Sequence, residues 1–200
     1  QEQLLTPGFS LRQMIEHDQY GSFILWGPPG SGKTTIARLI EKKTSHTFCS
    51  CSAVLSKISE VKGLMEKAAH RHSYENRKTI VFIDEIHRFN KAQHDAFLPY
   101  VESGAIILIG TTTENPSFEV IPALLSRCHV FVLESLSVEN LHKILLRAVS
   151  MVPKHLVCED PVLQFLAENA GGDARKALND LEMVCRNAET RTEVWPPGYH

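Results

Sequence analysis

The sequence predicts an α/β fold in which a parallel sheet is followed by a small helical domain. Three observations support this class. Short apolar runs alternate with longer amphipathic stretches between residues 23 and 133, a glycine-rich segment follows the first run, and only helical patterns follow residue 136. Because strands that alternate with helices are connected by right-handed crossovers, they form a parallel sheet with helices on both faces.

Five strands are expected where short apolar runs are bounded by turn-forming residues. Their ranges are 23–26, 47–51, 79–83, 105–109 and 130–133. The run from Thr79 to Ile83 has no polar alternation, which is typical of a strand covered on both faces.

Helical spacing of apolar residues predicts helices between and after these strands. Their ranges are 33–43, 55–71, 91–102, 138–149, 162–169 and 174–187. Pro99 should kink or shorten the third of them, because proline lacks the backbone N–H that a helix interior needs.

The order of these elements predicts two domains. An α/β domain is expected over residues 1–136 and a helical lid domain over 137–190. Ser137 is the expected N-cap of the first lid helix. The residues Trp195-Pro196-Pro197 fit no helix, and we expect a disordered tail over 191–200.

Composition excludes several classes of protein. Apolar residues make up 43% and charged residues 22% of the chain, so a wholly disordered or coiled-coil protein is excluded. No apolar run approaches the roughly 20 residues that span a bilayer, so no membrane partner is expected. The net charge of −2 neither favours nor excludes nucleic acid. The chain begins with Gln1 rather than methionine, so we expect a piece of a longer protein.

The cysteines predict a reducing compartment. They are 5 in number and show no C-x-x-C spacing, which favours free thiols over disulfides. Cys49 and Cys51 alternate along one expected strand, so core packing is favoured over metal ligation.

The strongest motif is a phosphate-binding loop. Gly27-Pro28-Pro29-Gly30-Ser31-Gly32-Lys33-Thr34 matches G-x-x-x-x-G-K-[ST] in full, between an expected strand and an expected helix. Its glycines let backbone N–H groups point at phosphate, Lys33 reaches the β- and γ-phosphates, and Thr34 coordinates Mg²⁺. ATP and Mg²⁺ are therefore expected. The residues expected to bind the nucleotide are Pro28, Pro29, Gly30, Ser31, Gly32, Lys33, Thr34 and Thr35.

Two acids follow the strand 79–83. Asp84 and Glu85 would lie at the carboxyl end of a sheet strand, where open α/β sheets bind ligands. Asp84 is the expected Mg²⁺ ligand, and Glu85 is expected to orient and deprotonate the attacking water. An ordinary acidic turn is the alternative. A second acid in this place favours hydrolysis over phosphoryl transfer to a bound acceptor.

A threonine-rich segment follows the strand 105–109. Hydroxyl groups at this point would lie between the two phosphate-binding elements, and we expect Thr113, or next to it Thr112, to sense the γ-phosphate or to hold the attacking water. A plain turn is the alternative.

These motifs together resemble the AAA+ ATPases of the RarA/Mgs family. The strings that carry the resemblance, besides the phosphate loop, are D-E-I-H-R-F-N-K at 84–91, T-T-E-N-P-S-F at 112–118, L-L-S-R-C at 124–128 and G-D-A-R at 172–175. The first two of these strings are more specific than a phosphate loop, and the resemblance spans residues 1–189. Thr111 stands where the family has a small alanine.

The resemblance implies a sheet of order 5-1-4-3-2 and an ATP site shared between neighbouring subunits. On this pattern Arg127 matches the arginine finger that acts on the next subunit, and Arg175 matches the lid arginine that contacts the γ-phosphate. His87 and Arg88 either contact DNA, relay between sites, or cap the helix that starts near Asn90.

The family also implies partners and location. Its members are DNA-stimulated ATPases that act at stalled replication forks, so forked or single-stranded DNA ends are expected partners. A homo-oligomer formed through a C-terminal domain outside this chain, a replication polymerase and a Werner-type helicase are implied as well. The expected location is the nucleus, or the cytoplasm if the protein is bacterial.

Three alternatives to a replication-fork ATPase are considered. A clamp-loader or branch-migration subunit shares every local feature except the two most specific strings. A nucleotide-switched scaffold would need binding but not hydrolysis. A small-molecule kinase shares the phosphate loop but gives Arg127 and Arg175 no role.

Overall fold

The computed structural model of the chain describes residues 10–53, 58–75, 77–151 and 158–192. The described residues form two compact units. One contains the residues up to 27 and those from 32 to 133, and the other contains 28–31 and the residues from 134 onward. The predicted domain boundary at residue 136 stays a prediction.

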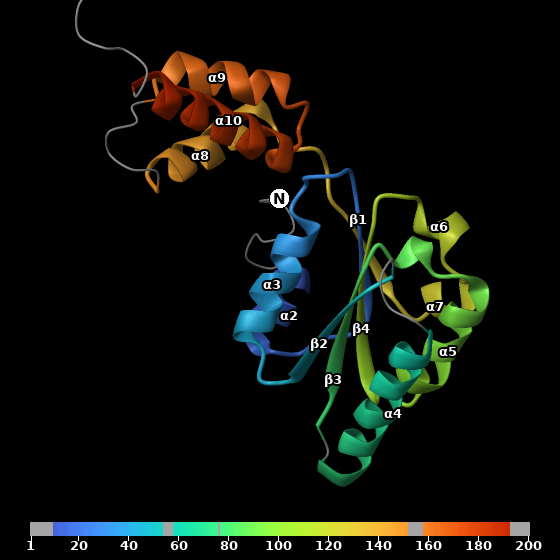
Figure 1. Cartoon of the computed structure of the whole chain (residues 1–200). Coiled ribbons are helices and arrows are strands. Elements are labelled where there is room, and N and C mark those ends of the chain that lie inside the picture. Colours follow the sequence, from blue (N-terminus) through green and yellow to red (C-terminus); the bar gives the residue numbers. More distant parts are fainter. Residues whose placement is uncertain (1–9, 54–57, 76, 152–157, 193–200) are drawn as a thin grey trace, which may run out of the picture. The chain divides into compact units, whose positions relative to one another are not determined.

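The first unit contains a parallel sheet (Figure 1). Its strands are β1 (Phe23–Trp26), β2 (Thr47–Ser52), β3 (Thr79–Asp84), β4 (Ile106–Thr112) and β5 (His129–Val132). They lie in the order β2-β3-β4-β1-β5, which confirms the predicted order 5-1-4-3-2. Trp26 pairs with Thr112 and Ile83 with Gly110, so β1, β3 and β4 end at one edge of the sheet.

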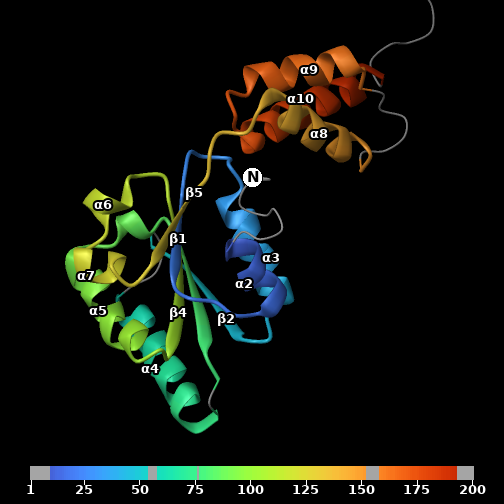
Figure 2. The same cartoon turned by 180° about the vertical axis from the view of Figure 1, so that it is seen from behind.

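Helices cover both faces of this sheet (Figures 1 and 2). One face carries α2 (Ser10–His17) and α3 (Lys33–Lys43). The other carries α4 (Ile58–Glu75), α5 (Lys91–Glu102), α6 (Pro116–Glu119) and α7 (Pro122–Leu125). Alternation along β1 divides the core: Phe23 and Leu25 pack in the cluster with α3, whereas Ile24 packs in the cluster with α4 and α5.

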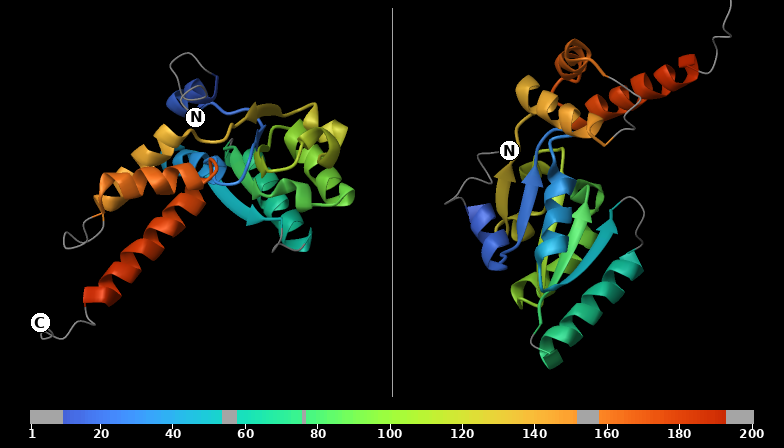
Figure 3. Two further views of the ribbon diagram at one scale, coloured as in Figure 1. Left: turned by 90° about the horizontal axis from the view of Figure 1, so that it is seen from above. Right: turned by 90° about the vertical axis from the view of Figure 1, so that its left-hand side faces the viewer.

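The described residues of the second unit form three helices, shown in orange and red in Figure 3. They are α8 (Val138–Val149), α9 (Asp160–Asn169) and α10 (Ala174–Thr192). Their core is made of aliphatic side chains, among them Leu141, Leu145 and Leu163. The Ser137 hydroxyl accepts the Asn140 N–H at 3.2 Å, so the predicted N-cap is confirmed.

Several predictions about the elements differ from the structure; for example, α4 ends at Glu75 rather than at residue 71, and α9 begins at Asp160 rather than at residue 162. β4 runs to Thr112 rather than 109, because Thr111 and Thr112 continue the ladder instead of starting a turn. Pro99 does not shorten α5, which ends at Glu102. Because no proline or glycine interrupts it, α10 continues to Thr192, so residues 191 and 192 are helical rather than part of a disordered tail; residues 193–200 lie outside the described residues.

Two further features follow from local sequence. A 3₁₀ helix, η1 (Ile86–Arg88), directly follows the acids at the end of β3. Asn90 and Gln93 form a reciprocal capping box at the start of α5, with both hydrogen bonds at 2.9 Å. No helix of the described part of the chain is long and apolar enough to cross a bilayer.

Candidate active site

The segment between β1 and α3 has the backbone that a phosphate loop needs. Gly30 and Gly32 have φ values of +67° and +100°, a region in which residues with a Cβ are strained. A Cβ on Gly27 would lie 2.3 Å from the Leu133 carbonyl oxygen, so glycine is required here for packing. Gly32 precedes α3, and the first N–H groups of that helix form an anion-binding end.

Lys33 is the first residue of α3 and is buried, with 7% of its surface exposed. Its ammonium donates to the Gly27 carbonyl at 2.7 Å. A buried cation needs such partners because losing water costs several kcal/mol. The ammonium is therefore held against the first residue of the loop, where it can exchange this carbonyl for a phosphate oxygen.

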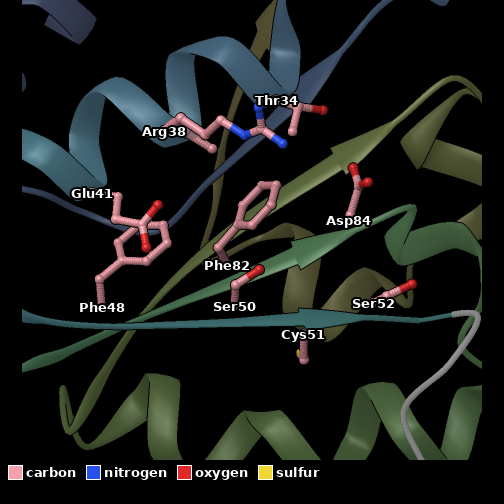
Figure 4. A pocket seen from close by; sticks show the side chains of 10 residues that line it. Thr34, Arg38, Glu41, Phe48, Ser50, Cys51, Ser52, Phe82 and Asp84 are labelled. Atoms are coloured by element: carbon pink, nitrogen blue, oxygen red, sulfur yellow. The ribbon is translucent and has the colours of Figure 1, made fainter.

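A pocket of about 220 Å³ lies on the face of the sheet covered by α3 (Figure 4). Thr34 and Asp84 line it together, one from α3 and one from the end of β3. Its other lining residues are Ala37, Arg38, Glu41, Phe48, Ser50, Cys51, Ser52 and Phe82. In Figure 4, Thr34 and Asp84 lie at one end of the pocket, and Glu41 and Phe48 lie at the other.

The Thr34 and Asp84 side chains fit a magnesium ion. A hydroxyl and a carboxylate that line one pocket are hard oxygen donors, the kind that Mg²⁺ prefers. Asp84 Oδ1 already accepts the Thr111 hydroxyl at 2.6 Å, which leaves Oδ2 for an ion. These two residues would hold Mg²⁺ through few protein ligands, as in other phosphate-linked magnesium sites.

Thr111 connects the two acids in a way that the sequence alone did not reveal. Its hydroxyl donates to Asp84, and its oxygen accepts the Glu85 backbone N–H at 3.1 Å. Thr111 is fully buried on β4, the strand beside β3. Glu85 has φ 58° and ψ 50°, a left-handed conformation that costs energy for a residue with a Cβ. The Thr111 hydroxyl therefore stabilises a strained backbone at the predicted general base.

The predicted base also has a side-chain partner. Glu85 Oε2 lies 3.2 Å from His87 Nε2, and His87 Nδ1 lies 3.0 Å from Thr112 Oγ1. His87 does not cap α5, because Asn90 and Gln93 cap it. The alternative in which His87 caps that helix was therefore wrong.

The structure gives the positions of Thr113 and Arg175, but the contacts of these residues do not test their predicted roles. Thr113 is half-buried and directly follows β4, at the edge of the sheet where β1 and β3 end. Arg175 lies in the first turn of α10, and its backbone N–H donates to Asp173 at 2.8 Å. Both roles at the γ-phosphate stay predictions.

Arg127 lies at the opposite edge of the sheet from Gly27. It precedes β5 by two residues, and His129 at the start of β5 pairs with Phe23 at the start of β1. Gly27 follows the other end of β1. The four residues of β1 span about 13 Å between these two ends. Arg127 lines a separate hollow of about 530 Å³ and pairs with Glu102 at 2.6 Å.

Cys51 packs against the core, as the sequence predicted. Burial raises the pKa of the Cys51 thiol to about 11, with the neighbouring Cys49 adding to the shift, and Cys51 contacts the core beneath α4. Figure 4 shows that Cys51 points to the opposite side of β2 from Ser50 and Ser52. Cys49 and Cys51 are both half-buried and free of disulfides.

A phosphate loop, an acid pair and a magnesium-compatible pocket on a parallel sheet define a P-loop nucleotide-binding core. Comparison with known families makes this specific. The family described as "ATPase family associated with various cellular activities (AAA)" matches residues 23–136, more than half of the chain. The chain belongs to this family of ATPases.

Within the AAA family, the chain falls in the RarA/MgsA/WRNIP1 group. It is 45% identical over 197 residues to ATPase WRNIP1 of Dictyostelium discoideum, covering 96% of this chain and 22% of the relative. It is 45% identical over 194 residues to replication-associated recombination protein A of Escherichia coli K12, covering 94% and 43%. The chain thus spans less than half the length of these relatives, which come from bacteria and a eukaryote.

Solved structures show the same fold. The chain resembles the Holliday junction branch migration motor RuvB of Thermotoga maritima with a TM-score of 0.71 and 28% identity, covering 92% of this chain and 60% of that one. A variant of the same RuvB has a TM-score of 0.74 and 26% identity, covering 96% and 62%.

Proposed function

We propose that this chain is the ATP-hydrolysing core of a DNA-stimulated ATPase that maintains replication forks, and that its active site is completed by a neighbouring subunit. The observation that carries hydrolysis is the shared pocket of Thr34 and Asp84. It brings the phosphate loop and the acidic strand end together around one space. Glu85, next to Asp84, supplies a second acid that can activate water, which favours hydrolysis over phosphoryl transfer to a bound acceptor.

Each residue has a defined role in this proposal. The backbone of the loop and Lys33 bind the phosphates of ATP, and Glu85 accepts the proton of the attacking water. Mg²⁺ held by Thr34 and Asp84 would neutralise charge on the phosphates. Thr113 and Arg175 contact the γ-phosphate, so that the site responds to whether that group is present.

The position of Arg127 supports a site shared between subunits. In its own chain it lies at the edge of the sheet opposite to Gly27, so it cannot complete the pocket of Thr34 and Asp84. An exposed arginine at that edge is available to a neighbouring molecule. Such a trans-acting arginine contributes about 10³–10⁵ in rate to phosphoryl transfer.

The proposed partners follow from the relatives. A protein named for replication-associated recombination is 45% identical to this chain, which supports forked or single-stranded DNA as the activator. A homo-oligomer, a replication polymerase and a Werner-type helicase are further proposed partners. A eukaryotic protein of this kind would act in the nucleus and a bacterial one in the cytoplasm.

Two assays test the proposal. The rate of ATP hydrolysis per subunit should rise with protein concentration, because the arginine comes from a neighbour, and forked DNA should raise it further. A rate per subunit that is independent of concentration over the range in which the protein self-associates would contradict the shared site. No effect of forked DNA on the chain, or on a longer protein that contains it, would contradict the role at forks.

A branch-migration subunit is the second candidate, favoured by the fold of RuvB and its 28% identity. A junction-unwinding assay with four-way DNA separates it from a fork ATPase. A nucleotide-switched scaffold is separated by Glu85→Gln, which should abolish hydrolysis while binding remains. If the variant still maintains replication forks in cells, a nucleotide-switched scaffold describes the protein better than a hydrolase does.

A further inference from the structure

The side chains of Glu85, His87 and Thr112 form a chain of polar contacts across the end of two strands. Glu85 follows β3, His87 lies in η1, and Thr112 is the last residue of β4. The His87 ring lies 3.2 Å from Glu85 Oε2 through Nε2 and 3.0 Å from Thr112 Oγ1 through Nδ1. The His87 side chain is 8% exposed, whereas that of Glu85 is 35% exposed. The ring is therefore fixed inside the protein and holds a carboxylate that reaches the surface.

These contacts favour one tautomer of a neutral His87 ring. An ionised Glu85 carries no proton, so a ring that faces it with Nε2–H is favoured over one that faces it with a lone pair. Nδ1 then accepts, and the Thr112 hydroxyl is the donor beside it. Thr112 Oγ1 also lies 3.0 Å from both the backbone N–H and the carbonyl of Glu114. The N–H donates to the threonine oxygen and fixes its position, and the single hydroxyl proton has two acceptors within reach, the Glu114 carbonyl and His87 Nδ1.

We infer that His87 is a positioning residue that aims Glu85 for hydrolysis, with Thr112 fixing the His87 ring. This inference rests on the proposed role of Glu85 as the base. His87 holds Oε2, so Oε1 is left to accept the proton of the attacking water. Without His87, a carboxylate with one-third of its surface exposed would sample several rotamers, and a misplacement of about 1 Å can cost about a hundredfold in rate.

The arrangement also connects the base to the candidate γ-phosphate sensor. Thr112 directly precedes Thr113, so a backbone shift at Thr113 moves the residue that fixes the His87 ring. Thr111, on the other side of Thr112, holds the Asp84 side chain and the Glu85 backbone. Two adjacent threonines of β4 therefore position both acids, one directly and one through His87.

Two variants of His87 separate its two polar contacts. In His87→Gln the amide nitrogen occupies roughly the place of Nε2 and can donate to Glu85. In His87→Asn it occupies roughly the place of Nδ1, so it reaches Thr112 but not Glu85. We expect His87→Asn to lower kcat for ATP hydrolysis by about 10- to 100-fold with KM and melting temperature little changed, and His87→Gln to retain most of kcat.

A second pair of variants tests Thr112. Thr112→Val removes the hydroxyl and should lower kcat as His87→Asn does, whereas Thr112→Ser should retain activity. Because the two residues act in series, the double variant Thr112→Val/His87→Asn should be no slower than the slower single variant. Multiplied losses in the double variant would contradict a connected pair.

Several outcomes would overturn the inference. Equal losses in His87→Gln and His87→Asn would indicate a packing role only, and an unchanged or raised kcat in His87→Asn would show that the contact does not aim the base. Glu85→Gln in the same assay distinguishes failure of the proposed function, because normal hydrolysis by that variant would mean that Glu85 is not the base.

A spectroscopic measurement keeps the inference testable whatever the rate. Long-range ¹H–¹⁵N spectra of the wild-type chain should show neutral His87 as the Nε2–H tautomer. Thr112→Val should weaken this preference, whereas Thr112→Ser should not. A dominant Nδ1–H tautomer in the wild-type chain would contradict the proposed hydrogen bonds.

Discussion

Arg127 Nη2 lies 2.6 Å from Glu102 Oε1 at the amino edge of the sheet. The same guanidinium donates through Nη1 to the Ala123 carbonyl at 2.6 Å. The two charged side chains are 40% and 50% exposed, and such surface pairs contribute only about 0–1 kcal/mol. Arg127 is therefore held by an interaction that it can exchange for a phosphate in a less hydrated site.

Arg127 is expected to act on the site of a neighbouring subunit. Arg127→Ala should lower hydrolysis by about 10³–10⁵ through loss of transition-state charge stabilisation, while ATP binding remains. Glu85→Gln should also be inactive, through loss of the base. Mixing the two inactive variants should restore hydrolysis, because Arg127 of the Glu85→Gln chain can complete the intact pocket of the other. The measurement is phosphate release from equimolar mixtures.

The matched control is a mixture of Arg127→Ala with the double variant Glu85→Gln/Arg127→Ala. It contains no functional arginine at this position and should stay inactive. Equal activity in the control mixture and the test mixture would contradict a shared site, as would wild-type activity of Arg127→Ala alone.

Glu102 is expected to restrain Arg127. Glu102→Gln removes the carboxylate charge from which Arg127 must separate before it can act on a neighbouring subunit. Hydrolysis at limiting protein concentration should therefore rise by up to about fivefold, the equivalent of about 1 kcal/mol. The melting temperature should change little, because both side chains are half exposed. The same change made in an Arg127→Ala background should have no effect on hydrolysis. A loss of activity in Glu102→Gln would instead mean that the carboxylate holds Arg127 in its working position.

Thr111 is expected to stabilise both the fold and the ion site. Thr111→Val keeps the shape but removes a fully buried hydroxyl that donates to Asp84 and accepts the Glu85 N–H, and these two partners are partly buried. Leaving such groups unpaired costs about 1–3 kcal/mol in the free energy of unfolding, which urea denaturation measures. The Mg²⁺ concentration for half-maximal activity should also rise. Thr111→Ser retains the hydroxyl and should behave like the wild type; equal behaviour of both variants would contradict the role of the hydroxyl.

Sequence patterns predicted the sheet and its pocket because both depend on local signals. The uninterrupted apolar runs of β1 and β3 identify central strands, and the residues after them necessarily lie at one edge of a parallel sheet. The glycine-rich loop and the acids were therefore predictable as neighbours. β4 was predicted too short because a threonine run is typical of turns as well as of strands, and only pairing with β1 decides between them.

The contacts that orient the acids could not be predicted in the same way. The bond from Thr111 to Asp84 joins residues 27 positions apart, and its geometry depends on the register of β3 against β4. The substitution of threonine for a small residue at 111 was the one visible signal. The position of His87 depends on the left-handed conformation of Glu85, which no pattern in the sequence specifies.

His94 is expected to make stability depend on pH. It is 1% exposed on α5, and its Nε2 donates to the Ile86 carbonyl at 3.1 Å, directly beneath the segment that carries Glu85 and His87. Burial lowers the pKa of His94, although the Ile86 hydrogen bond and the charge of Asp95 act in the opposite direction. The folded chain therefore keeps His94 neutral at a pH where the unfolded chain takes up a proton.

The sign of the pH effect follows from this proton uptake. Below the ordinary histidine pKa of about 6.5, the unfolded state binds more protons than the folded state, so the free energy of unfolding falls as the pH falls. His94→Leu should lose about 1–3 kcal/mol at pH 7.5, because the Ile86 carbonyl loses its donor. Its stability should nevertheless fall less steeply between pH 7 and 5 than that of the wild type, because the variant lacks the buried imidazole. Parallel pH profiles from urea denaturation of the two proteins would show that His94 is not the group responsible.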